Sequence, residues 1–167
     1  MRKALLIAIL VLALAVPLGG VAAAPGSTHH KAQTRVFVAL LSGDQQVPPV
    51  TSAAHGLAVF WLSPDGTQLH YYVLVANLQD ATMAHIHTGT STQSGPHVAT
   101  LFHSMTPVTV TGKLASGTIT SGQLEETLAG HPLSDLVAKM AAGDTYVNVH
   151  TKKYPDGEIR GQIQQID

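Results

Sequence analysis

The sequence predicts an all-β protein, an antiparallel Greek-key β-sandwich or barrel with a short helical insert near residues 121–142. Short apolar runs, several of which alternate with polar residues, cover most of the chain after residue 35. Gly, Pro, Asp and Ser separate these runs about every ten residues, as they do where turns join strands. Apolar residues at helical spacing are confined to residues 133–140. These observations favour antiparallel strands over a helical or α/β fold.

Each predicted strand follows from its own residues. Residues 36–41 and 56–62 form the first two, and Pro64-Asp65-Gly66 predicts the turn after the second. Both alternating faces of residues 68–78 are apolar, which indicates a central strand. Further strands are predicted at residues 82–87, 98–102, 108–112, 145–150 and 158–166. Four valines of the central strands are expected in the core: Val73, Val75, Val147 and Val149.

The first 34 residues are expected to lie outside the folded domain. Arg2 and Lys3 precede the apolar run 4–16, and small residues follow it, so residues 1–23 have the pattern of an export signal cleaved after Ala23. The run is shorter than the about 20 residues that a membrane span needs, so retention as an anchor is the less favoured alternative. Residues 24–34 are a flexible lead-in, and 35–167 form one domain. The predicted location is secreted or extracytoplasmic, with the cell surface as an alternative.

Charge and cysteine content exclude several classes of function. The chain has nine basic and ten acidic residues, and loss of Arg2 and Lys3 leaves a net charge of −3. Without a basic cluster, neither nucleic acid nor, after signal cleavage, a membrane surface is an expected partner. The chain has no cysteine, which excludes disulfides, thiolate metal sites and a cysteine nucleophile. Ten histidines are its unusual feature, and they direct attention to metals.

Three histidines have a spacing that fits a metal site. His85 and His87 are one residue apart, so a strand places both rings on one face. Residues 145–150 alternate cleanly and place His150 on the polar face of a second strand. Imidazole ligands suit copper and zinc, and binding should weaken below about pH 6, where protons compete for the same nitrogens. His97, in a loop ten residues after His87, is a weaker fourth candidate. Histidines that only form structural hydrogen bonds are the alternative.

No catalytic residues are assigned from the sequence. Carboxylates are scattered, and no nucleophile elbow, phosphate loop or dinucleotide motif is present. Glu158 and Arg160 alternate on the last predicted strand and are expected to form a structural salt bridge with each other. The sequence therefore favours a protein that is not an enzyme.

Four segments in this order resemble the CHRD domain, a family named after chordin. The segments are LSGDQQVPPV (residues 41–50), AHIHTG (84–89), YVNVHT (146–151) and PDGEIRGQ (155–162). The resemblance covers about residues 35–164 and implies a secreted, β-rich domain without a settled activity. A looser similarity links AHIH (84–87), SGPH (94–97) and VNVH (147–150) to the histidine segments around copper in copper–zinc superoxide dismutase. The missing cysteines, the short loop before His97 and the lack of a zinc loop depart from that enzyme.

Three functions remain open at this point. The first is a secreted domain that binds copper or zinc through its histidine cluster. The second is an extracellular protein-interaction module whose histidines are structural. The third is a copper-only enzyme similar to superoxide dismutase. The sequence does not choose the metal, the partner or the oligomeric state.

Overall fold

The computed structural model describes residues 35–166 and confirms the predicted fold class. Its strands are β1 (Val36–Ser42), β2 (His55–Leu62), β3 (Leu69–Thr88), β4 (His97–Ile119), β5 (Thr145–Thr151), β6 (Ile159–Gln162) and β7 (Gln164–Ile166). The helical insert contains two 3-10 turns, Ser121–Gln123 and Glu126–Leu128, and helix α1 (Leu133–Ala141). A third 3-10 turn, Gly43–Gln45, follows β1. The expected export signal and lead-in lie outside the described residues.

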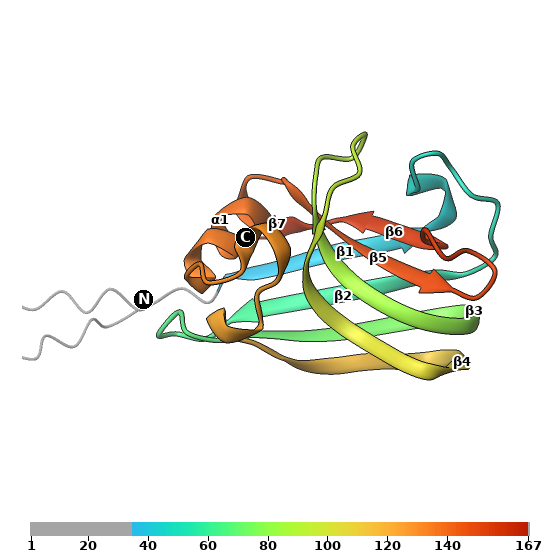
Figure 1. Cartoon of the computed structure of the whole chain (residues 1–167), viewed down its shortest axis with the longest axis horizontal. Coiled ribbons are helices and arrows are strands. Elements are labelled where there is room, and N and C mark those ends of the chain that lie inside the picture. Colours follow the sequence, from blue (N-terminus) through green and yellow to red (C-terminus); the bar gives the residue numbers. More distant parts are fainter. Residues whose placement is uncertain (1–34, 167) are drawn as a thin grey trace, which may run out of the picture. The chain divides into compact units, whose positions relative to one another are not determined.

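Antiparallel pairing closes five strands into a barrel, because β3 is long enough to pair with two strands along one edge. Residues 69–76 of β3 pair with β2, and residues 81–88 pair with β5. The pairs β2–β1, β1–β6 and β6–β5 complete the circle. Strand β4 lies along the other edge of β3, and Figure 1 shows these two as long curved strands side by side. Helix α1 contacts β7 at one end of the barrel (Figure 1).

Alternation along the strands determines which residues fill the barrel. The four expected valines, Val73, Val75, Val147 and Val149, are all buried in the core. Leu133, Leu136, Val137 and Met140 of α1 add their apolar face to the same core. Among residues 35–166, no helix is long and apolar enough to span a membrane.

Strand β4 differs most from expectation. The sequence predicts separate strands at 98–102 and 108–112, whereas β4 runs without a break from His97 to Ile119. Met83 pairs with His103 and Ala81 pairs with Val108, so residues 104–107 bulge opposite Thr82 alone. The bulge consists of Ser104, Met105, Thr106 and Pro107, and this irregular stretch interrupts the apolar pattern by which a continuous strand would be recognised.

Candidate metal centre

The pairing of β3 with β5 brings together the three histidines predicted from alternation. His85 pairs with Asn148, and Met83 pairs with His150. Ala84 and Ile86 face the core, as do Val147 and Val149. His85, His87 and His150 therefore lie on the opposite, outer face of the same pair of strands.

One ring nitrogen from each of these three histidines lies within 4.8 Å of the nitrogens of the other two. Around a tetrahedral ion with metal–nitrogen distances of about 2.0–2.1 Å, ligand nitrogens are about 3.4 Å apart. Small rotations of the rings are enough to close this difference. The expected convergence of the three side chains is confirmed, and the cluster has the geometry to hold a metal ion.

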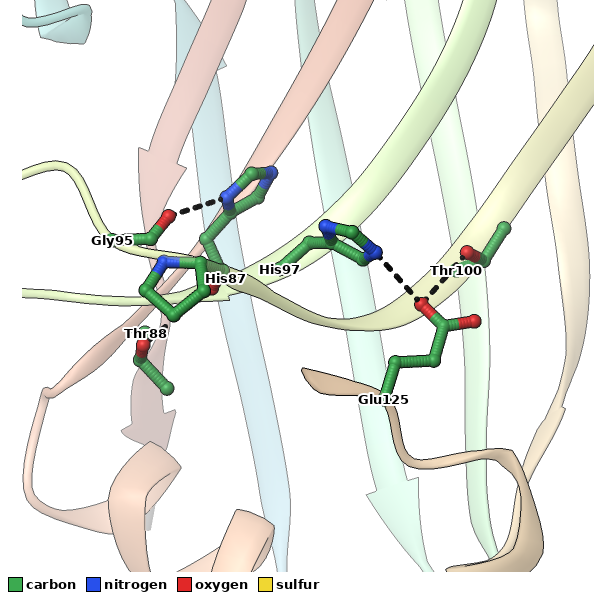
Figure 2. A network of polar contacts seen from close by, with 7 residues as sticks. His87, Thr88, Gly95, His97, Thr100 and Glu125 are labelled. Carbon is green, nitrogen blue, oxygen red and sulfur yellow. Dashed lines mark hydrogen bonds and ion pairs between the residues drawn. The ribbon is translucent and has the colours of Figure 1, made fainter. Parts of the chain in front are cut away.

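The orientation of two rings is fixed by backbone carbonyls. His87 Nδ1 lies 2.9 Å from the Gly95 carbonyl oxygen, a contact visible in Figure 2, and His150 Nδ1 lies 2.9 Å from that of Pro155. A carbonyl oxygen only accepts, so Nδ1 of each ring donates the proton and Nε2 keeps the lone pair. Metal-binding histidines commonly use their second nitrogen in this way.

Three nitrogens of the cluster are buried without a hydrogen-bond partner among the described residues: His85 Nδ1, His87 Nε2 and His150 Nε2. A buried polar atom without a partner costs about 1–3 kcal/mol. Because Nδ1 of His87 and of His150 donates to a carbonyl, the lone pair on each Nε2 is left without a donor. One nitrogen per histidine is therefore available for the same ion.

Burial keeps these imidazoles neutral. It lowers the pKa of His85 from 6.5 to about 3, and nearby His150 and His87 add to the effect. Burial also lowers the pKa of His87 to about 4, although the Gly95 carbonyl opposes this. The pKa of His150 is lowered mainly by burial, against the Pro155 carbonyl and the Asp156 carboxylate. Neutral imidazole is the form that binds metal ions.

His97 lies beside this cluster without belonging to the converging three. Its ring centroid is 4.9 Å from that of His85 and 6.1 Å from that of His87. Its Nε2 lies 3.3 Å from Glu125 Oε2, which also accepts a hydrogen bond from Thr100 Oγ1 (Figure 2). His97 therefore borders the cluster, and Glu125 orients its ring.

The salt bridge expected between Glu158 and Arg160 does not form among the described residues. The Glu158 carboxylate accepts hydrogen bonds from the hydroxyls of Ser52 and Thr151. Arg160 Nη2 instead donates to the backbone carbonyls of Thr90 and Gln93. Glu158 precedes β6, so strand alternation does not apply to its side chain, and the expectation was wrong for that reason.

Arg160 holds the loop between β3 and β4 that orients His87. Its guanidinium carbon lies 3.5 Å from the centre of the Tyr146 ring, whose other neighbour is the stacked ring of His87. The Tyr146 hydroxyl accepts a hydrogen bond from the Gly95 backbone N–H. Arg160 and Tyr146 thus fix the loop segment whose carbonyl accepts from His87.

The sequence of this domain matches the model of a known protein family. The model of the CHRD domain matches residues 37–163. The chain belongs to the CHRD domain family. Neither a curated protein nor a solved structure matches the chain significantly. CHRD domains are typical of extracellular proteins and generally act as protein-interaction modules.

The four segments that carry the CHRD resemblance meet around the histidines. Gln46 of the first segment donates to Asn148 Oδ1 of the third, and Asn148 Nδ2 donates to the Asp156 carbonyl of the fourth. Gly157 packs against both amides and has a φ of +129°, where a side chain is strained. The second segment contributes His85 and His87. Residues far apart in the CHRD sequence therefore build one structural unit around the cluster.

The sequence reasoning missed the residues that support these histidines. Gly95, Pro155, Tyr146 and Glu125 each contact a histidine of this region, and two of these contacts, those of Tyr146 and Glu125, join elements far apart in the chain. Clean alternation in residues 145–150 already placed Tyr146 and Asn148 on the face of His150. No comparable signal marked Glu125. The remaining described histidines, His55, His70, His103 and His131, are not part of the converging group.

Proposed function

We propose that this CHRD domain binds one divalent transition-metal ion, copper or zinc, through His85, His87 and His150. The observation that carries the proposal is the set of three buried, unpartnered ring nitrogens on one face. Purely structural histidines are expected to satisfy their buried nitrogens, as the large majority of buried side-chain polar atoms do. A metal ion satisfies all three at once.

Single-histidine variants test this proposal. Untagged protein should bind about one equivalent of zinc or copper, measured by elemental analysis and competitive titration. His85→Ala and His150→Ala should each lower the affinity by more than the about 10–100-fold that loss of an outer-shell partner costs. His131→Ala is the matched control, because His131 is exposed and its ring pairs with Asp135. Equal affinity in all four proteins, or no binding by the wild type, contradicts the proposal.

We also propose that the protein is exported, because it has a leader-like N-terminus and belongs to a family typical of extracellular proteins. Protein recovered outside the producing cell should begin at Ala24, which N-terminal sequencing or intact mass measures. An intact Met1 on that protein contradicts cleavage after Ala23.

A second candidate function is protein interaction, favoured by the outer face of β1, β2 and β3. Nine side chains on this face contain no Asp, Glu, Lys or Arg, and Leu40 is 69% exposed. Outward-facing sheet surfaces are usually polar, so a continuous apolar face indicates contact with another molecule. Cross-strand register arranges the nine in three rows: Val36–Trp61–His70, Val38–Val59–Tyr72 and Leu40–Leu57–Leu74.

The occupant that we propose for this apolar face is a second copy of the chain. An uncharged face pairs with its own copy without like-charge repulsion. Polar residues border it on β4, where Lys113 pairs with Leu74 and Thr118 pairs with His70. An apolar centre with a polar rim is the usual composition of an interface. Strand and residue spacing give the nine side chains about 300 Å², well below the about 800 Å² per partner of a standard interface. The association should therefore be weak.

A further inference from the structure

The outer face around the metal centre carries two more potential ligands, Met83 and His103. Met83 lies two residues before His85 on β3, and the intervening Ala84 faces the core. In the register, Met83 lies directly opposite His150 on β5 and directly opposite His103 on β4. Pairing therefore aligns His103, Met83 and His150 in one row across three strands, next to His85.

Cross-strand geometry places the Met83 side chain within reach of the cluster. Directly opposite residues of an antiparallel pair have Cβ atoms about 4.5–5.5 Å apart. Met83 is only partly buried, and a methionine side chain has three rotatable bonds that let its sulfur adapt to a neighbour.

Sulfur changes which metal such a site prefers. Thioether ligands are soft and select Cu(I), whereas imidazoles alone accept both zinc and copper. The chain has no cysteine, so methionine is its only source of sulfur ligands. Of the other methionines among the described residues, Met140 is fully buried in the core and Met105 lies in the β4 bulge, 92% exposed. Met83 is the methionine that pairs directly with a histidine of the cluster.

We propose that Met83 is a fourth, soft ligand that makes this a copper site able to hold Cu(I) as well as Cu(II). The inference rests on the proposed metal binding through His85, His87 and His150 and specifies its metal. It concerns binding in both oxidation states, and no redox step is part of it. His103 lies opposite Met83 on β4, in the same row.

The experiment compares Met83→Leu with Met105→Leu. Leucine is close to methionine in volume, so both variants should fold. Cu(I) affinity is measured under anaerobic, reducing conditions against a chromogenic Cu(I) chelator, and Zn(II) affinity is measured in parallel. Met83→Leu should lower the Cu(I) affinity by about tenfold or more and leave the Zn(II) affinity within about threefold. Met105→Leu should change neither. X-ray absorption of the Cu(I) protein should show a sulfur ligand that Met83→Leu removes.

The outcomes separate this inference from the function on which it rests. Wild-type binding of zinc and copper with an unchanged Cu(I) affinity in Met83→Leu overturns the role of Met83 and leaves the histidine site standing. Equal losses in Met83→Leu and Met105→Leu overturn it as well, because they show a general effect of methionine loss. Failure of the wild type to bind either metal overturns both proposals.

Discussion

At the scale of single residues, the histidines of the centre are controlled by what their second nitrogens contact. The Gly95 and Pro155 carbonyls occupy Nδ1 of His87 and His150 and leave Nε2 as the nitrogen that is free to bind. His85 has no such contact at Nδ1, which is itself the unpartnered atom. The set of unpartnered nitrogens is therefore one Nδ1 and two Nε2, and it depends on backbone positions as well as on the histidines themselves.

Burial of these rings predicts an unusual pH dependence of metal binding. A protonated imidazole cannot bind, and the lowered pKa values of His85 and His87, about 3 and about 4, delay protonation to well below the usual 6.5. Zinc affinity should therefore change little between pH 7.5 and 6 and fall mainly at lower pH. Zinc affinity should therefore be lost at a lower pH than the value of about 6 expected for unburied imidazoles.

A synthetic peptide of residues 25–34 provides the control, because it carries His29 and His30 without a fold that buries them. Its weaker zinc binding should decline through pH 6.5. Competitive titration at four pH values between 7.5 and 4.5 measures both. An equally steep decline of protein and peptide near pH 6.5 would show that burial does not protect the site.

At the scale of elements, the site depends on two connections, the loop from β3 to β4 and the turn from β5 to β6. Arg160 holds the first through the Thr90 and Gln93 carbonyls. Gly157 belongs to the second, in which Asn148 donates to the Asp156 carbonyl. A Cβ at residue 157 would collide with the Asn148 amide and lie 2.6 Å from Gln46 Nε2. Because Gly157 has no side chain, the segments that contain Gln46, Asn148 and Gly157 can meet.

Gly157→Ala should therefore destabilise the domain more than its backbone conformation alone explains. The matched control is Gly112→Ala, because Gly112 has a nearly equal φ of +127° and no atom within 4 Å of where the alanine methyl group would lie. Backbone strain of about 1–3 kcal/mol applies to both variants. The collision with two buried amides applies only to Gly157→Ala. Urea unfolding should show the larger loss for Gly157→Ala, and equal losses would mean that the amides move aside freely.

The strands that alternate cleanly were predictable, and so were the three histidines they carry. Residues 145–150 indicated both the core valines and the direction of His150, because alternation is a local property. The partners of Arg160 and Glu158 were not predictable, since they lie on loops and distant strands that only the closed barrel brings near. Glu125 likewise reaches His97 from the helical insert. Local periodicity therefore predicts on which face of a strand a side chain lies, whereas its hydrogen-bond partners depend on the tertiary fold.

At the scale of the whole molecule, the barrel presents two chemically different outer faces. The candidate metal centre lies outside the strand pair β3–β5, and the uncharged rows lie outside β1, β2 and the first half of β3. Because β3 takes part in both, its 20 residues join a polar face to an apolar one. The two proposed functions therefore use separate surfaces and are compatible in one chain.

Self-association through the apolar face gives the prediction at this scale. Because the face is small, the wild type should be a monomer at about 1 μM and shift toward a dimer at hundreds of micromolar, a concentration range suited to weak interfaces. Leu40→Glu places a charge within the apolar face of both copies and should keep the protein monomeric. Met105→Glu adds the same charge at a residue that is 92% exposed in β4, outside the apolar rows, and should dimerise like the wild type. Sedimentation equilibrium measures the mass of each protein, and a wild type that stays monomeric throughout would remove the second copy as the occupant of this face.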